Sequence, residues 1–263
     1  MDRTKIDWCD STWNPVTGCL HGCKYCYARG IANRFSGGGE KWSDDNLFVL
    51  DEKFYAEESE SACPYPYGFK PTFHRYKLDE YANKKGRNIF VCSMADLFGE
   101  WVPDSWIEEV FNACRYAPQH NYLFLTKNPD RYVDLQDKGK LVQSNNMWYG
   151  ASVTNENQFI KAIRAFVDLK CSTKTFLSVE PLIEDITTTE YWNDCIISKL
   201  ADWVIVGAET GRRKNKVVPE RSWIRSIAFD YEYEIPVFMK SSLADIWGEP
   251  LIQEFPEQLM RNK

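Results

Sequence analysis

Apolar and polar positions along this chain change from an irregular distribution to a regular one after about residue 88. From there, short continuous apolar runs return at intervals of about 25–33 residues, the length of one βαβ repeat. Continuous runs are typical of strands buried on both faces, so this part of the chain predicts a parallel sheet. The runs begin near Ile89, Tyr122, Met147, Lys174, Trp203 and Ile235.

Amphipathic helical patterns separate these runs. We expect Asp104 to cap one helix and Asn155 to cap another, each followed by apolar side chains every three or four residues. The predicted buried positions are Ile107, Val110, Phe111 and Cys114 in the first helix, and Phe159, Ile163, Phe166 and Val167 in the second.

The N-terminal third is less regular. We expect a first strand around Asn14–Thr17, a helix over Tyr27–Phe35, and an irregular elaboration at about 36–87 with short extended pieces at Leu47–Leu50 and Phe73–Tyr76. With the six later runs this makes seven strands. The pattern therefore predicts an α/β fold, a partial or near-complete parallel (β/α) barrel, with residues 1–263 in a single domain.

Composition narrows the class of protein. A hydrophobic fraction of 44% and a charged fraction of 27% are ordinary for a globular protein, and the net charge of −6 argues against a histone-like nucleic-acid binder. The N-terminus has no signal-peptide pattern, and no apolar run approaches membrane-spanning length. We therefore expect a cytoplasmic protein without a membrane partner, whose nine cysteines stay reduced.

Three cysteines at C-x3-C-x2-C spacing, Cys19, Cys23 and Cys26, carry the clearest chemical signal. Cysteine thiolates hold iron–sulfur clusters, usually four to a cubane, so three leave one iron open to an outside ligand. Gly18 and Gly22 allow the tight loop that this requires. The alternatives are a zinc site completed by His21 or a remote ligand, and cysteines that share no metal; a second spaced cysteine pair, usual for zinc, is absent from the sequence.

This spacing, with Tyr25 before the third cysteine, resembles the radical S-adenosylmethionine superfamily. The resemblance implies a 4Fe–4S cluster whose open iron is chelated by the amino and carboxylate groups of S-adenosylmethionine. It also implies reductive cleavage to methionine and a 5′-deoxyadenosyl radical, an external one-electron reductant, and a core of six strands to which the last predicted strand is an addition.

In parallel barrels, functional residues gather where the strands end. Polar or charged residues follow the apolar runs at Ser93–Asp96, Thr126–Lys127, Ser152–Glu156, Ser178–Pro181 and Gly207–Gly211. Solvation of strand ends and helix capping account for some of them, Asn155 among them, but several ionisable groups on one rim indicate a ligand site.

The resemblance becomes more specific over five segments. Together they are similar to a phage- and prophage-associated radical-SAM-like family of unassigned chemistry, itself distantly similar to spore photoproduct lyase. The chain departs from this family at Lys240–Ser242, where members carry Lys-Gln-Trp-Gly, and many members have a longer spacing between the first two cysteines. The segments are Trp13–Cys19, Ser93–Phe98, Leu125–Lys127, Ser178–Leu182 and Trp203–Gly207.

The resemblance also implies roles for the strand-end residues. Ser93 or Asp96 takes the place of a turn that binds the methionine ammonium, and Lys127 is expected to pair with the methionine carboxylate. Ser152 and Glu180 are expected to hold the ribose hydroxyls, and Tyr25 to lie beside the cluster.

A basic loop follows the sixth strand, with Arg212, Arg213, Lys214 and Lys216. Cations beside the site favour a phosphate-bearing substrate, a nucleotide or nucleic acid, although a solvated surface loop has the same composition. Cys92 is a candidate hydrogen-atom donor if its side chain faces inward, and a core residue otherwise.

The leading hypothesis is therefore a radical enzyme acting on a nucleic-acid-related substrate. The alternatives are a radical enzyme for a protein or small metabolite, and a non-catalytic metal-binding or nucleic-acid-associated accessory protein.

Overall fold

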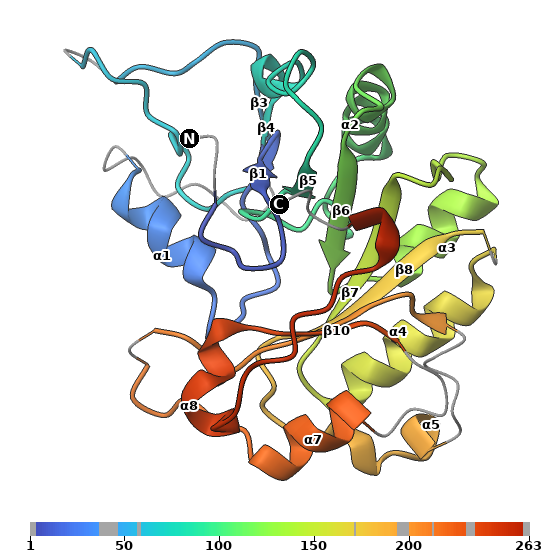
Figure 1. The fold of residues 1–263 in the computed structure, drawn as a ribbon. Helices are drawn as coiled ribbons and strands as arrows, with labels where there is room; N and C mark the ends of the chain where they lie inside the picture. The colour runs from blue at the N-terminus through green and yellow to red at the C-terminus, as the bar shows by residue number, and fades with distance from the viewer. Residues whose placement is uncertain are drawn as a thin grey trace.

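Seven parallel strands form the main sheet of this computed structural model, which describes residues 4–36, 47–56, 59–170, 172–193, 200–211, 213–229 and 235–259. The sheet curls into a half-barrel with the order β1-β5-β6-β7-β8-β9-β10 (Figure 1). This confirms the predicted α/β class, with six core strands and an added β10. The strands are β1 (Ser11–Trp13), β5 (Asn88–Val91), β6 (Asn121–Thr126), β7 (Met147–Val153), β8 (Lys174–Val179), β9 (Val204–Val206) and β10 (Val237–Met239).

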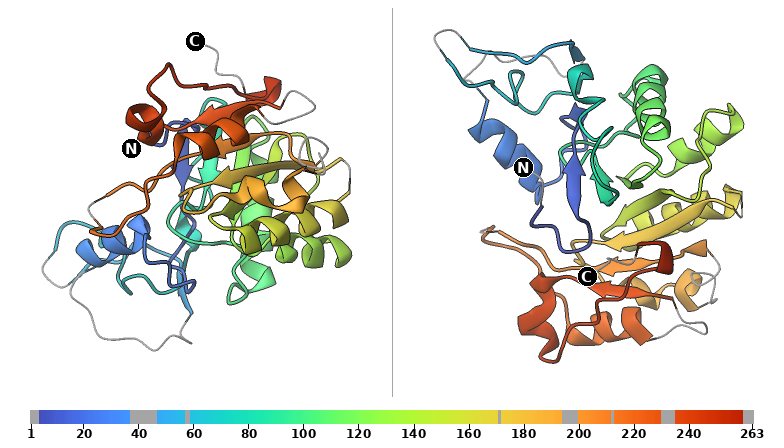
Figure 2. Two further views of the ribbon diagram at one scale, coloured as in Figure 1. Left: turned by 90° about the horizontal axis from the view of Figure 1, so that it is seen from below. Right: turned by 45° about the horizontal axis from the view of Figure 1, so that its top comes forward.

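Helices cover the convex face of this sheet, and they do not cover its concave face (Figure 2). Within this sheet, neighbouring strands follow one another in chain order. Because the crossovers between parallel strands are right-handed, the connecting helices all lie on the same side of the sheet. The helices that follow β5 onward are α2 (Asp104–Tyr116), α3 (Asp130–Asp137), α4 (Glu156–Asp168), α5 (Glu190–Asn193), α7 (Arg221–Phe229) and α8 (Ala244–Trp247). Short 3-10 helices lie at Arg75–Lys77, Ile186–Thr188, Ser241–Leu243 and Glu257–Leu259.

The helix predictions hold with two corrections. Asn155 caps α4 by accepting a hydrogen bond from the Gln158 N–H. Asp104 instead lies in the first turn of α2, behind Pro103, and makes no capping hydrogen bond. Val167 is 58% exposed, because α4 turns it away from the sheet, whereas the other predicted apolar positions of both helices are buried.

The prediction of a barrel strand at Asn14–Thr17 is wrong. The strand β1 ends at Trp13, after which Pro15 offers no N–H to a sheet ladder and the Asn14 side chain accepts a hydrogen bond from the Met94 N–H. The next residues form β2 (Val16–Thr17), which pairs antiparallel with β4 (Thr72–His74).

A second, three-stranded sheet is thereby built beside the half-barrel. Its order is β2-β4-β3, with β3 (Phe48–Leu50) parallel to β4. Both extended pieces expected in the elaboration contribute strands here, but Arg75 and Tyr76 belong to a 3-10 helix instead. The helix α1 (Tyr27–Arg34) follows the cysteine loop as expected. The organisation of the whole chain as one domain stays a prediction.

Side chains of the main strands alternate between two hydrophobic cores. In β7, Tyr149 faces the helices, whereas Trp148 faces the concave side. The next inward position must be glycine, because a Cβ on Gly150 would lie 2.3 Å from the Phe176 ring. Trp8, from the N-terminal segment, completes the inner core.

The inner core fills only the lower part of the half-barrel. Along β8, for example, Phe176 belongs to the aromatic core, whereas Ser178, two residues further along the same face, lines a cavity. The concave face thus changes from apolar to polar toward the carboxyl ends of the strands. Within the described residues, no helix is both long and apolar enough to cross a membrane.

The two loop glycines provide a matched test of the local fold. Gly18 and Gly22 have φ of 86° and 70°, but a Cβ on Gly18 would lie 2.1 Å from the Lys70 carbonyl oxygen, whereas one on Gly22 meets nothing within 4 Å. We expect Gly18→Ala to lower the free energy of unfolding by about 3 kcal/mol, and Gly22→Ala by about 1 kcal/mol. Urea denaturation measures both, and equal effects would contradict the packing described here.

Candidate functional site

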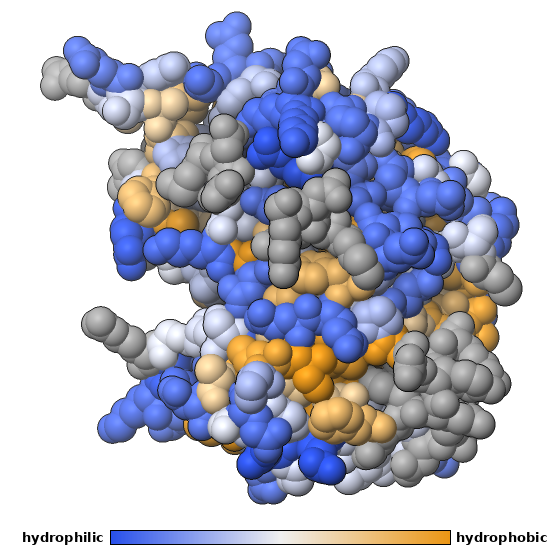
Figure 3. Space-filling view, in the orientation of Figure 1, coloured by the Kyte–Doolittle hydropathy of each residue, from blue (hydrophilic) through white to orange (hydrophobic). Residues whose placement is uncertain are grey.

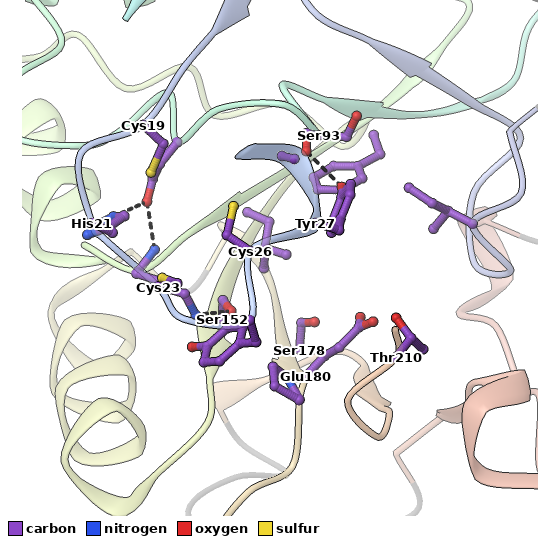
Figure 4. A pocket seen from close by; sticks show the side chains of 18 of the residues that line it. Cys19, His21, Cys23, Cys26, Tyr27, Ser93, Ser152, Ser178, Glu180 and Thr210 are labelled. Atoms are coloured by element: carbon purple, nitrogen blue, oxygen red, sulfur yellow. Dashed lines mark hydrogen bonds and ion pairs between the residues drawn. The ribbon is translucent and has the colours of Figure 1, made fainter. Parts of the chain in front are cut away.

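A cavity of about 370 Å³ opens at the carboxyl ends of the strands (Figure 4). It brings together residues that lie up to about 235 positions apart in the sequence, from Lys5 to Lys240. Every residue predicted to bind the cluster or S-adenosylmethionine lines it: Cys19, Cys23, Cys26, Tyr25, Ser93, Asp96, Lys127, Ser152 and Glu180.

The cysteine loop lies at one side of this cavity, with three thiols that form no disulfide. Cys26 is the N-cap of α1, and its Sγ accepts a hydrogen bond from the Arg29 N–H at 3.4 Å. Burial raises the pKa of the Cys19 thiol to about 12, although the backbone of His21 donates a hydrogen bond to it. The free loop therefore holds a protonated Cys19, which a metal would have to deprotonate on binding.

Three free thiols are the principal metal-donor set of the cavity. Among the described residues, no three His, Cys, Asp or Glu side chains converge closely enough to hold one metal ion. A zinc site needs its sulfurs about 2.3 Å from a common centre, whereas the thiolates of a cubane each bind a different iron and stay further apart. Three thiols spaced around one cavity fit a three-cysteine cluster, and the Nε2 of His21 is already bonded to Asp96.

Asp96 is the most heavily bonded side chain of the site. Its Oδ1 accepts from the Thr126 hydroxyl at 2.7 Å and the Phe98 N–H at 3.0 Å. Its Oδ2 accepts from the Lys127 N–H at 2.9 Å and lies 2.7 Å from the His21 Nε2. The residue is 4% exposed. Asp96 thus joins the turn after β5, the end of β6 and the cysteine loop, and its oxygens are already engaged.

Lys127 and Ser152 form a second connection across neighbouring strand ends. The Lys127 Nζ donates to the Ser152 Oγ at 2.7 Å and lies 5.6 Å from the centre of the Tyr25 ring. Glu180, the predicted ribose ligand, forms an ion pair with Lys240. Lys240 belongs to the segment that departs from the resembling family, so its place in the site was not foreseen from the sequence.

Ser178 is a site residue that the sequence reasoning did not single out. It is 0% exposed and lines the cavity, and its Oγ has no hydrogen-bond partner among the described residues. Ser178 faces Ser152 in the register of β7 and β8, and Figure 4 shows it pointing to the same side as Glu180. The sequence signal that could have indicated Ser178 is its separation of two residues from Glu180, because side chains two residues apart in an extended chain lie on the same face.

Other residues near the strand ends also line the cavity. His21, Glu209 and Thr210 lie on its rim, and Lys5 and Trp8 come from the N-terminal segment. The sequence indicates His21 only as a possible zinc ligand, and the N-terminal segment has no periodic pattern that would predict its place in the cavity.

Cys92 does not reach the cavity. Strict alternation from Phe90 would turn it inward, but β5 ends at Val91 and the backbone of Cys92 has a φ of 58°. This change of direction packs the thiol in the outer core, where burial raises its pKa to about 12. A direct hydrogen-atom transfer from Cys92 therefore finds no support in the geometry.

The basic loop divides into residues with different surroundings. Arg213 donates to both carboxylate oxygens of Glu209, at 2.6 and 2.5 Å, and this contact lowers the pKa of Glu209. Lys214 and Lys216 are exposed, and Arg212 lies outside the described residues. None of the three described cations lines the cavity.

Fold and site together define a class of protein, an all-parallel half-barrel with a three-cysteine loop at the carboxyl ends of its strands. Residues 3–250 match the family described as "Protein of unknown function (DUF5131)", and the chain belongs to that family. A comparison with curated proteins gives no match.

Solved structures of spore photoproduct lyase are similar to the chain. For the lyase complexed with dinucleoside spore photoproduct, the TM-score is 0.43 at 13% identity, covering 84% of this chain and 60% of the other. For a variant with the same ligand the TM-score is 0.44, again at 13% identity and with the same coverage. The chain thus spans about 60% of the length of these structures. The association with phages stays a prediction.

Removing the Asp96 carboxylate should weaken the whole site before any ligand binds. Asp96→Ala leaves the Thr126 hydroxyl and the Phe98 and Lys127 N–H groups without their acceptor. We expect the free energy of unfolding to fall by about 3–5 kcal/mol. Urea denaturation of the metal-free protein measures this, with the exposed Asp137→Ala as a control expected to stay within about 0.5 kcal/mol. A small loss for Asp96→Ala would show that the carboxylate does not hold these segments together.

Proposed function

We propose that this protein is a radical S-adenosylmethionine enzyme, with the cluster bound by Cys19, Cys23 and Cys26. The observation that carries the proposal is that three thiols from one loop line the same cavity as the polar ends of neighbouring parallel strands. When bound, the 4Fe–4S cluster would supply the electron and the open iron for reductive cleavage of S-adenosylmethionine to a 5′-deoxyadenosyl radical.

The residues of the chain would bind and orient the cofactor. Lys127, held by Ser152 and by the face of Tyr25, offers its ammonium to the methionine carboxylate. Ser93, whose hydroxyl makes one hydrogen bond at 3.2 Å to Asn14, is the better acceptor for the methionine ammonium, since Asp96 is already engaged. Asp96 then acts as a positioning residue, which fixes the backbone of Lys127 and the ring of His21.

The far end of the cavity suits the nucleoside part. Glu180 is tied to Lys240 but retains acceptor capacity for a ribose diol, and Ser178 beside it has an unpartnered hydroxyl. Trp8 and Phe90 form an apolar floor under this part, which would keep water away from a reactive radical.

The substrate that we propose is nucleic-acid-related, with an external one-electron reductant as the second partner. Glu209 and Thr210, at the end of β9, line the cavity, and the exposed Lys214 and Lys216 follow on the same loop. Arg213 is not given this role, because its Nε and Nη2 both donate to Glu209.

Loss of any one loop cysteine should abolish the cluster. We expect Cys19→Ala, Cys23→Ala and Cys26→Ala each to lose iron and 5′-deoxyadenosine formation after anaerobic reconstitution, because each thiolate would hold a separate iron. Cys63→Ala is the control and should load iron like the wild type, since Cys63 does not line the cavity.

Two outcomes would contradict this assignment. An equal need for Cys63 would indicate a four-cysteine electron-transfer site. A colourless, zinc-loaded wild-type protein would favour the accessory role.

Ser178→Ala separates ligand binding from stability. Its hydroxyl has no partner among the residues that the structure describes, so its removal should leave the free energy of unfolding unchanged or slightly raised. If S-adenosylmethionine supplies the missing partner, its affinity should fall about five- to tenfold, measured by calorimetry on the reconstituted protein. The exposed Ser222→Ala is the control. Unchanged affinity would remove Ser178 from the proposed cofactor site.

A further inference from the structure

We infer that the exposed surface around α1, beside the cysteine loop, binds single-stranded nucleic acid and presents it to the cavity. The inference deepens the proposed function, on which it rests for the chemistry that follows binding. The surface itself is argued from charge, exposure and position. It consists of Lys24, Tyr27, Arg29, Arg34 and Phe35.

The charge of this surface is unlike that of the chain as a whole. The chain carries 38 acidic residues and a net charge of −6, yet residues 11–36 contain no Asp or Glu. Lys24, Arg29 and Arg34 are exposed, and within the described part of the chain none of them has a carboxylate partner. Several cations elsewhere in the chain do form such pairs, as in Arg75–Asp51, Arg131–Asp104, Lys140–Glu108, Lys174–Asp202 and Arg221–Glu249.

Exposed aromatic residues are interspersed with these cations along the sequence. Tyr27 and Phe35 are each 54% exposed, and the Tyr27 hydroxyl donates a hydrogen bond to the Ser93 carbonyl at 2.8 Å. Nucleic-acid bases stack on such rings, whereas an acidic protein offers carboxylates but no comparable set of planar faces. In a duplex the bases are already stacked and paired, so the rings favour an unpaired strand.

The position of the surface connects it to the proposed chemistry. Cys26, Tyr27 and Ala28, at the start of α1, line the cavity, and so do Glu209 and Thr210 on the loop after β9. Figures 1 and 2 show α1 and this loop on the same side of the molecule. Figure 3 shows the surface hollowed between them.

The two basic surfaces therefore flank one opening. A strand that contacts Arg29 and Arg34 on one side and the exposed Lys214 and Lys216 on the other would cross the mouth of the cavity. If its phosphate backbone is bound on both sides, the nucleotide between the two contacts is free to enter the cavity.

Fluorescence anisotropy with a labelled oligothymidylate of about 12 nucleotides tests the inference, since single-strand sites typically span about 4–16 nucleotides. The variant is Arg29→Gln with Arg34→Gln, and neither residue lines the cavity. We expect at least tenfold weaker binding at low salt, and a slope of log affinity against log salt that is flatter by about 1.4. Phe35→Ala should weaken binding about five- to 150-fold through lost stacking.

The matched control is Lys85→Gln with Lys170→Gln. These exposed cations precede β5 and β8, at the edge of the sheet opposite the cavity, and should leave binding unchanged. An equal loss in the control, equally tight binding of the matching duplex, or no salt-dependent binding by the wild type would each overturn the inference. So would a variant that keeps its oligonucleotide affinity but is reduced more slowly by an acidic electron-carrier protein.

Cluster assembly distinguishes this inference from the proposed function. Both arginine substitutions should leave iron loading and uncoupled 5′-deoxyadenosine formation at the wild-type level. Oligonucleotide binding by a protein that cannot assemble a cluster would support the surface and contradict the radical function. A working cluster without oligonucleotide binding would overturn the surface alone.

Discussion

The buried carboxylate of Asp96 is the interaction on which the arrangement of the site depends. A carboxylate that is nearly inaccessible to water is stable only when its oxygens are fully bonded, and here the donors come from three separate stretches of chain. The cysteine loop, the turn after β5 and the end of β6 therefore have to come together at once. The positions of the thiols relative to Lys127 follow from that bonding.

The half-barrel contributes a gradient of polarity to this arrangement. Its inward positions carry large aromatic side chains near the amino ends of the strands and serines or charged groups near the carboxyl ends. Because the strands do not close into a full barrel, the N-terminal segment supplies Trp8 to cover the aromatic layer. The cavity lies where aromatic packing stops, which is why residues from many strands meet there.

Sequence patterns predicted what is determined locally. The apolar runs located six of the seven main strands, and cysteine spacing together with strand-end polarity selected residues that line one cavity. Features that depend on distant partners were not predictable in this way. The pairing of His21 with Asp96 joins positions 75 residues apart, and the outward turn of Cys92 depends on a left-handed backbone at the end of β5. The misplaced first strand has the same cause, since Val16 and Thr17 are drawn into a sheet whose other strands lie more than thirty residues further on.

Two features of the free protein near the cavity depart from a fully packed and fully bonded structure. A buried hydroxyl without a partner, as in Ser178, costs about 1–3 kcal/mol, and alanine would avoid that cost. The exposed rings of Tyr27 and Phe35, with the exposed Arg29 and Arg34 nearby, are the second departure, on the outside. Such departures are expected at functional sites, where a ligand supplies what the free chain lacks. A nucleoside hydroxyl would satisfy Ser178, and phosphates and bases would satisfy α1, so both departures are relieved by ligands of related chemistry.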